Sequence, residues 1–245
     1  MNSQQGGRGT VDLSVIVPVY NEEAVVEATL RETAGVLRQT PFRFEILAID
    51  DGSADATPWR LQLLRKEIAE LRILTLRPNS GQSAAFGAGF RHARGAIIVT
   101  MDADGQNDPA DIPQLVDALR EADACCGYRA VRRDTLGKRW GSWIANRVRN
   151  LALGEAVVDT GCSLKAFRAE LVQDVQMWRG MHRFLPSIFL MQGARLKQVP
   201  VHHRPRAGGR SKYTNWGRLK ETIWDLWAVR WMKKRHRPFR VEAQD

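Results

Sequence analysis

Four oxygen-bearing side chains follow one apolar run near the middle of the chain. The segment A-I-I-V-T-M-D-A-D-G-Q-N-D-P, residues 96–109, starts as a buried strand and then supplies Asp102, Asp104, Gln106 and Asp108. This arrangement places them at the carboxyl edge of a sheet, where α/β proteins bind ligands. Carboxylate and amide oxygens at this spacing suit a hard cation such as Mg2+ or Mn2+, which can share a diphosphate. An acidic turn that caps a helix, with Asp108 as the N-cap before Pro109, is a simpler interpretation, and both roles can coexist.

The same pattern of strand, acidic turn and helix occurs earlier in the chain. Residues 13–20 are predicted to form a buried first strand, with Asn21 as the N-cap of a helix over 22–37. A second strand over 45–49 runs into Asp50 and Asp51. A helix over about 59–70, a strand over 73–76 and a small-residue helix that ends near residue 93 continue the alternation. This order is typical of a doubly wound, mostly parallel sheet whose ligands bind beyond the strand C-termini.

The glycines of G-Q-S-A-A-F-G-A-G, residues 81–89, match neither the dinucleotide fingerprint nor the phosphate loop of nucleotide-hydrolysing proteins. We therefore expect them to allow close packing of a helix on the sheet. The loop over 77–82 that precedes this helix is a candidate wall of a nucleotide site.

Composition limits the function classes. With 245 residues and 44% hydrophobic content, the chain can form one α/β domain with a C-terminal appendage. The net charge of +10 predicts a polyanionic partner: nucleic acid, an anionic membrane surface or a phosphorylated substrate. Three cysteines form neither a disulfide framework nor a C-x-x-C motif, which favours a reducing cytoplasm. No stretch approaches the roughly 18 apolar residues of a membrane span, so no transmembrane helices are expected.

Several motifs, taken in order, resemble one family. The series S-V-I-V-P-V-Y-N-E-E, I-D-D-G-S, N-S-G-Q-S-A-A-F-G-A-G and M-D-A-D-G-Q-N-D-P resembles the GT-A domain of family 2 glycosyltransferases. D-T-G-C-S-L-K-A-F-R over 159–168 and R-A-G-G-R-S-K-Y over 206–213 resemble the polyprenyl-phosphate glycosyltransferases, typified by dolichyl-phosphate mannose synthase. The resemblance covers roughly residues 13–213. It implies a Rossmann-like α/β fold, with a mostly parallel sheet and flanking helices. Many members of the family carry C-terminal transmembrane helices, whereas the residue pattern here predicts a basic amphipathic C-terminal helix instead.

The resemblance also implies a domain organisation. Residues 1–10 would form a disordered tail, and 11–205 a GT-A catalytic domain with a nucleotide-sugar half over 11–108 and an acceptor half over 109–205. Residues 206–245 would form a lid loop and a membrane-interfacial basic helix and tail. The implied reaction moves a hexose, with inversion, from a GDP- or UDP-linked donor to a polyprenyl (dolichyl or undecaprenyl) phosphate.

Site residues follow from the motif positions. The nucleotide sugar would contact Pro18, Tyr20, Glu22, Asp50, Asp51, Gln82, Asp102 and Ala103. Pro18 and Tyr20 can wall a base or ribose, and acidic side chains can accept from base N–H groups and ribose hydroxyls. Asp102, Asp104 and Gln106 would hold the Mg2+ or Mn2+ ion. Turn and cap chemistry at the strand ends is the alternative role for these acidic residues.

Basic residues in the second half would hold the acceptor. The implied set is Arg129, Lys138 or Arg139, Ser142, Arg206 and Lys212. Asp104, Arg129 and Arg206 would be catalytic. A phosphomonoester is already anionic near neutral pH, because its second pKa is roughly 6, so it needs no dedicated general base. A solvated helix face is the alternative role for the basic residues, and His182 is expected to be a packed or capping histidine.

Two amphipathic stripes predict contact with an anionic membrane surface. The first comprises Leu136, Trp140, Trp143, Ile144 and Leu151. The second comprises Trp216, Leu219, Ile223, Trp227 and Trp231, followed by K-K-R-H-R. Arg147, Lys220 and Arg230 interrupt the stripes and would have to snorkel. Packing of each stripe on the protein's own core is the alternative. The expected location is cytoplasmic, peripheral at the inner face of the membrane, directly or through a separate membrane-anchoring protein.

Two other functions compete with this hypothesis. A family 2 enzyme could glycosylate a different acceptor, such as a saccharide or a lipid A precursor, although the basic segments argue against a neutral one. The charge alone also suggests a nucleic-acid-binding module. The sequence contains no helix-turn-helix, zinc or RNA-binding aromatic motif, and acidic strand ends repel phosphates, so no nucleic-acid partner is expected.

Overall fold

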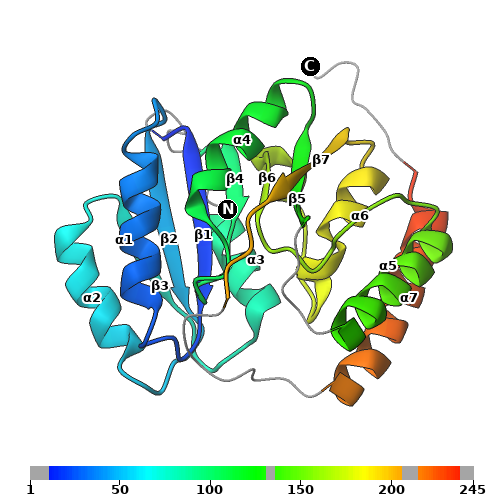
Figure 1. Cartoon of the computed structure of the whole chain (residues 1–245), viewed down its shortest axis with the longest axis horizontal. Helices are drawn as coiled ribbons and strands as arrows, with labels where there is room; N and C mark the ends of the chain where they lie inside the picture. Colours follow the sequence, from blue (N-terminus) through cyan, green and yellow to red (C-terminus); the bar gives the residue numbers. More distant parts are fainter. Residues whose placement is uncertain (1–10, 131–135, 206–214, 238–245) are drawn as a thin grey trace, which may run out of the picture.

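The structure, a computed structural model, describes residues 11–130, 136–205 and 215–237, without the side chains of 136–143 and 215–221. In this part of the chain seven strands form one sheet in the order β3-β2-β1-β4-β6-β5-β7 (Figure 1). The strands are β1 (Leu13–Val19), β2 (Phe44–Asp50), β3 (Leu71–Thr75), β4 (Ile97–Thr100), β5 (Ala124–Arg129), β6 (Lys165–Arg168) and β7 (Leu196–Val201). The helices are α1 (Val26–Leu37), α2 (Thr57–Glu67), α3 (Gln82–His92), α4 (Ile112–Asp117), α5 (Leu136–Leu153), α6 (Leu185–Met191) and α7 (Asn215–Arg235). The predicted α/β architecture is confirmed.

One strand departs from the parallel arrangement. β1 pairs in parallel with β2 and β4, β2 with β3, and β5 with β7, whereas β6 runs antiparallel to both β4 and β5. In this register Lys165, the first residue of β6, lies opposite Thr100, the last residue of β4. The start of β6 therefore lies at the edge where the other strands end.

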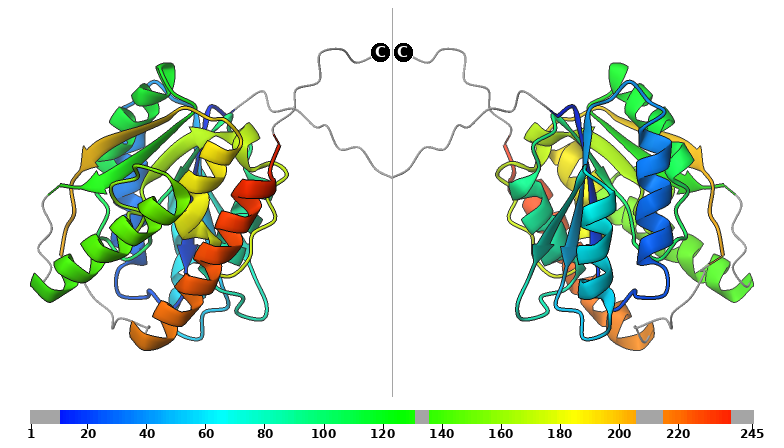
Figure 2. Two further views of the ribbon diagram at one scale, coloured as in Figure 1. Left: turned by 90° about the vertical axis from the view of Figure 1, so that its right-hand side faces the viewer. Right: turned by 90° about the vertical axis from the view of Figure 1, so that its left-hand side faces the viewer.

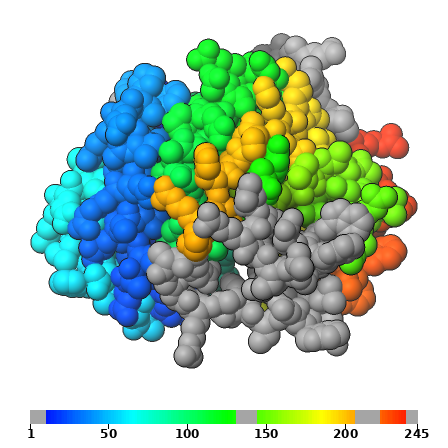
Figure 3. All heavy atoms as spheres, in the orientation of Figure 1, coloured from blue at the N-terminus to red at the C-terminus, as the bar shows by residue number. Residues whose placement is uncertain are grey.

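Helices cover both faces of the sheet (Figure 2). Along β1, Val15 and Val17 pack in a core cluster with α1, α2 and α4, whereas Ile16 packs in a second cluster with α3 and α6. This alternation follows from the two-residue period of a strand. Figure 3 shows α1, α4 and β7 on one face of the molecule.

Close packing explains one of the glycines. A Cβ added at Gly89 of α3 would lie 2.4 Å from Cγ2 of Ile16 in β1. Only a residue without a side chain fits at this distance, so the expectation of close helix-to-sheet packing is confirmed for Gly89. It is wrong for Gly81, where an added Cβ would meet nothing within 4 Å and the φ is +87°.

The predicted start of the first helix is wrong. α1 begins at Val26, and its N-cap residue Val25 makes no side-chain cap hydrogen bond. Asn21 instead adopts a left-handed conformation with φ of 51°, and its Oδ1 accepts a hydrogen bond from the backbone N of Ala54, 2.8 Å away. The Asn21 amide therefore joins the loop after β1 to the loop after β2, which periodicity could not reveal.

The C-terminal helix α7 packs beside α5 (Figure 2). Val229 of α7, Leu153 of α5 and Phe184 form a small separate core. Arg230 Nη1 donates to the carbonyl of Ala152 at 2.6 Å, and Lys233 Nζ donates to the carbonyl of Leu153 at 2.7 Å. These cations satisfy carbonyls at the end of α5 that lack partners within the helix. Arg230 therefore contacts α5, and the expectation that it would snorkel is wrong.

Candidate active site

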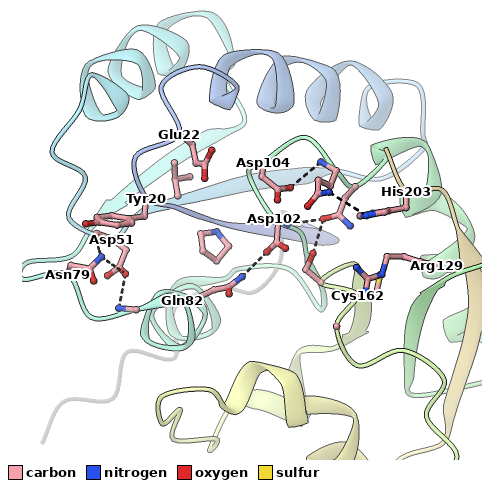
Figure 4. Close-up of a pocket in the computed structure, with 17 residues that line it drawn as sticks. Tyr20, Glu22, Asp51, Asn79, Gln82, Asp102, Asp104, Arg129, Cys162 and His203 are labelled. Atoms are coloured by element: carbon pink, nitrogen blue, oxygen red, sulfur yellow. Dashed lines mark hydrogen bonds between the residues drawn. The ribbon is translucent and has the colours of Figure 1, made fainter. Parts of the chain in front are cut away.

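The carboxyl ends of β1, β2 and β4 border a cavity of about 500 Å³ (Figure 4). This volume lies within the usual range of small-molecule sites, roughly 300–1,000 Å³. The predicted residues that line it are Pro18, Tyr20, Glu22, Asp51, Gln82, Asp102, Asp104, Gln106 and Arg129. Residues from both predicted halves of the site therefore share one space.

Two predicted nucleotide-sugar residues lie outside the lining of this cavity. Asp50 is 1% exposed, and its Oδ1 accepts a hydrogen bond from the backbone N of Ser53 at 2.9 Å. Ala103 is 3% exposed, and its carbonyl accepts from Thr29 Oγ1 of α1 at 3.3 Å. The structure places both residues in the turns that carry their cavity-lining neighbours, and their contact with a nucleotide sugar stays a prediction.

Asp51 lines the cavity and also fixes the loop after β3. Its carboxylate accepts hydrogen bonds from the backbone N of Ser80 at 2.8 Å, the backbone N of Gly81 at 2.7 Å and Nδ2 of Asn79 at 3.0 Å. Asn79 and Gly81 line the cavity too. The loop predicted to wall the site is thus positioned by an acidic residue at the end of β2.

The acidic turn after β4 forms one corner of the cavity. Asp104 is 7% exposed, and its Oδ1 accepts a hydrogen bond from the backbone N of Gln106 at 3.1 Å. Asp102 Oδ1 accepts from Nε2 of Gln82, the first residue of α3, at 2.7 Å. Asp108 accepts from the backbone N of Ala110 at 3.0 Å, which confirms its predicted cap role. Two carboxylates thus line the cavity while the third caps the following turn.

His203 is a cavity residue that sequence reasoning missed. It follows β7, and its Nε2 lies 3.4 Å from Nε2 of Gln106 in the acidic turn (Figure 4). A single β-bridge between Asn107 and His203 fixes this approach. Because β7 is parallel to β5, its end lies at the same edge as the acidic turn. The only sequence signal was a histidine after a short apolar strand.

Arg129 is held in place by a carboxylate from the D-T-G-C-S-L segment. Its Nε lies 2.7 Å from Oδ2 of Asp159, and its Nη2 lies 2.9 Å from Oδ1 of the same residue. The pair is largely buried. A Cβ at Gly161 would lie 2.9 Å from Arg129 Nη2, so any side chain at this position would displace the guanidinium from its present place. These two parallel hydrogen bonds to Asp159 fix the orientation of the Arg129 guanidinium at the cavity wall.

A smaller cavity of about 140 Å³ adjoins the first and shares Gln82, Asp102 and Gly161 with it. His182 lines this side cavity, and its Nδ1 lies 2.7 Å from Ser83 Oγ. Cys162 borders both cavities, but burial raises the pKa of its thiol, so it remains protonated at neutral pH. All three cysteines are free, and the chemistry of the site depends on oxygen and nitrogen groups.

The remaining predicted acceptor residues cannot be placed. Lys138, Arg139, Ser142, Arg206 and Lys212 lie outside the residues whose side chains the structure describes.

The described members of both predicted membrane stripes are exposed. On α5 these are Ile144 and Leu151, and on α7 they are Ile223, Trp227 and Trp231; the structure adds exposed Val148 on α5 and Trp224 on α7, which the predicted stripes did not include. Residues three or four apart share a face of a helix, so each set forms an apolar strip. None of the described helices combines the length and the hydropathy required to cross a bilayer.

Comparison with known proteins identifies the family. The sequence profile described as glycosyl transferase family 2 matches residues 14–176. The chain belongs to glycosyltransferase family 2. Within this family it is 39% identical over 236 residues to dodecaprenyl-phosphate galacturonate synthase of Rhizobium johnstonii. The matched region is 94% of this chain and 70% of that protein. It is 37% identical over 219 residues to undecaprenyl-phosphate 4-deoxy-4-formamido-L-arabinose transferase of Pseudomonas paraeruginosa. That match includes 88% of this chain and 64% of the relative. The chain thus spans about two thirds of these relatives.

Solved structures of other glycosyltransferases share the fold. Glucosyl-3-phosphoglycerate synthase from Mycobacterium tuberculosis, in complex with Mn2+, uridine diphosphate and phosphoglyceric acid, superposes with a TM-score of 0.68 at 20% identity over 92% of this chain and 79% of that one. A mannosyltransferase from Pyrobaculum calidifontis, in complex with GDP-mannose and Mn2+, superposes with a TM-score of 0.64 at 19% identity over 94% of this chain and 66% of that one. The predicted GT-A fold is confirmed.

Proposed function

We propose that this family 2 protein transfers a sugar, with inversion, from a nucleotide diphosphate sugar to a polyprenyl phosphate. The observation that carries the proposal is that the acidic turn of Asp102 and Asp104 and the guanidinium of Arg129 line the same cavity. A donor diphosphate and an acceptor phosphate are both anionic, so each requires cationic partners in a shared space. The names of the two relatives support a polyprenyl phosphate as acceptor.

The acidic turn fits a divalent cation. Its donors are the carboxylates of Asp102 and Asp104 and the amide oxygen of Gln106, with the imidazole of His203 beside them. These are ligand types that Mg2+ and Mn2+ accept. Among the described residues, no three His, Cys, Asp or Glu side chains form a preformed metal cage, which fits a cation that shares the oxygens of a diphosphate. When bound, the cation would stabilise the charge that develops on the leaving diphosphate.

The chain's own residues would then orient the two substrates. The loop held by Asp51 and the ring of Tyr20 would border the nucleoside, and Arg129, fixed by Asp159, would hold the acceptor phosphate. A phosphate oxygen would attack the anomeric carbon as the bond from that carbon to the diphosphate oxygen breaks. No proton needs to leave the nucleophile, because the phosphomonoester is already ionised near neutral pH.

A product assay tests the reaction. The purified protein is incubated with Mn2+, undecaprenyl phosphate and a panel of UDP- and GDP-linked sugars, and the lipid fraction is analysed by mass spectrometry. We expect a polyprenyl monophosphate sugar and one equivalent of nucleoside diphosphate. Omitting the metal or adding a chelator should remove the product. Transfer to a saccharide, with none to the lipid, would replace the proposed acceptor.

The exposed strips on α5 and α7 support direct attachment to an anionic membrane. Tryptophan rings favour the depth of lipid headgroups, and Lys234 and Arg235 at the end of α7 are exposed near the strip. With the strips on α5 and α7 bound to the membrane, the phosphate of a polyprenyl phosphate would reach the cavity from the headgroup layer.

Changing Trp224, Trp227 and Trp231 together to serine should weaken binding to phosphatidylglycerol-containing vesicles by at least about tenfold, since three large apolar contacts are lost. Vesicle co-sedimentation measures this effect. Trp59→Ser is the matched control, because Trp59 is 62% exposed, like Trp231 at 63%, but lies on α2 at the far side of the molecule (Figure 1). Equal binding of both variants and the unmodified protein would assign attachment to another surface.

A further inference from the structure

Lys165 is a buried cation on the wall of the side cavity. It is 3% exposed and begins β6, opposite Thr100 of β4. Directly opposed residues of an antiparallel pair project to the same face of a sheet, and both residues line the side cavity. Asp102, two residues after Thr100, also lines it. The register therefore places the ammonium beside the acidic turn.

The ammonium lacks a carboxylate partner in the part of the chain that the structure describes. Its Nζ donates to the carbonyl of Cys162, and none of the described ion pairs includes it. An ammonium has three N–H donors, and burying a charge is costly unless it is paired and fully hydrogen-bonded. A single carbonyl leaves most of this requirement unmet. An anionic ligand in the cavity would meet it.

The other walls increase the positive character of the side cavity. His182 and Arg183 line it, and Arg183 Nη1 donates to Thr222 Oγ1 at 3.2 Å. Asp102 is its one acidic residue, and this carboxylate accepts from Gln82 and faces the proposed cation site. Arg129, which would hold the acceptor phosphate, lines the main cavity but not this one. The side cavity thus offers a second anion site, next to the position of the donor diphosphate.

We propose that the transferred sugar is a uronic acid and that Lys165 binds its carboxylate. This inference rests on the proposed function, because it assigns the side cavity to the sugar of the donor. A sugar linked to the diphosphate beside Asp102 can enter the adjoining cavity of about 140 Å³. A neutral hexose would leave the buried ammonium without its counter-ion, which disfavours that donor. Lys165 is therefore a determinant of donor specificity.

Matched pairs of donors test the inference. UDP-glucuronic acid is compared with UDP-glucose, and UDP-galacturonic acid with UDP-galactose, each with Mn2+ and undecaprenyl phosphate. Within a pair the donors differ only in a carboxylate or a hydroxymethyl group. We expect kcat/KM to favour at least one uronate over its neutral counterpart by about 10- to 100-fold, the usual value of a charge-assisted hydrogen bond. Preference for the neutral donor in both pairs would overturn the inference.

Substitutions locate the preference. Lys165→Met keeps the length of the side chain without its charge and should bring the uronate-to-neutral ratio close to one, mainly by lowering kcat/KM for the uronate. Lys165→Arg should retain part of the preference. Lys197→Met is the control, since Lys197 pairs with Glu121 on the surface at 2.7 Å. A purely structural role would lower kcat/KM for both donors equally and leave their ratio unchanged, and that result would also overturn the inference.

The same assays separate other outcomes. If Lys165→Met instead raises KM for undecaprenyl phosphate and leaves the donor ratio unchanged, the ammonium serves the acceptor phosphate and the inference fails. If the unmodified protein transfers only neutral sugars to the lipid, the inference fails while the proposed function stands. If no donor in the panel yields a lipid product, the proposed function itself fails.

Discussion

Replacing Asp104 with asparagine should lower kcat/KM for sugar transfer by about a thousandfold or more. Stabilisation of developing charge by a bound cation is worth several kcal/mol, and each factor of ten in rate corresponds to about 1.4 kcal/mol. Asparagine keeps the size of the side chain and the oxygen that accepts from the backbone N of Gln106, so the turn should persist. Its neutral amide is a much weaker ligand for a hard cation.

The matched control is Asp108→Asn on the same turn. Asp108 caps the turn at Pro109 and pairs with Arg204 Nη2 at 2.8 Å, but does not line the cavity. Asparagine caps a helix as well as aspartate does, so the change should weaken the pair with Arg204 while the cap persists, with little change in stability or turnover. Binding of Mn2+ in the presence of uridine diphosphate, measured by calorimetry, should weaken only for Asp104→Asn. Unchanged Mn2+ binding and turnover in that variant would exclude Asp104 as a metal ligand.

Arg129→Lys should lower kcat/KM for polyprenyl phosphate by about 100-fold, with KM for the donor nearly unchanged. The guanidinium of Arg129 lines the cavity and donates two hydrogen bonds to Asp159, from Nε at 2.7 Å and from Nη2 at 2.9 Å. An ammonium is a point charge and cannot reproduce this planar two-sided geometry. Lysine still neutralises Asp159, which avoids the cost of about 3–5 kcal/mol that follows when a buried charge loses its partner.

Asp159→Asn distinguishes positioning from direct contact. It keeps the guanidinium and one acceptor for it, so we expect a smaller loss of turnover, about tenfold, caused by weaker orientation of Arg129. Thermal melting of both variants reports the stability of the pair. If both variants lose stability in parallel and the remaining folded protein turns over normally, Arg129 and Asp159 form a structural ion pair without contact to the acceptor.

Local patterns predicted the elements of the first half and one edge of the sheet. Apolar runs that end in acidic residues predicted β1, β2 and β4, and the structure places Asp51, Asp102 and Asp104 around one cavity. This worked because parallel strands end at the same edge, so each strand can be predicted separately. The helical period of the C-terminal stripe likewise predicted an apolar face, although it did not decide between membrane contact and packing on the core.

Orientation and long-range pairing were not readable. Asp50 and Asp51 are adjacent in the sequence, yet Asp50 is turned into the protein while Asp51 lines the cavity. The approach of His203 to Gln106 depends on the position of β7 beside β5, across many intervening residues. Lys165 lies within the D-T-G-C-S-L-K-A-F-R motif, but its proximity to the acidic turn depends on the antiparallel direction of β6. Tertiary pairing determines these relations, and no short window of sequence contains it.

Because β6 runs in the reverse direction, the residues proposed to bind the cation and the residue proposed to select the sugar lie on different strands. The acidic residues proposed to hold the cation lie in the turn after β4, while Lys165 belongs to a different strand that contributes its first residue to the neighbouring cavity. Because side chains alternate along β6, Ala166 projects away from Lys165, into the opposite core cluster. If Lys165 has the proposed role, a single codon change at position 165 would alter the glycan that is delivered and leave the proposed phosphate-binding residues intact, whereas a one-residue slip in this strand would exchange the positions of Lys165 and Ala166.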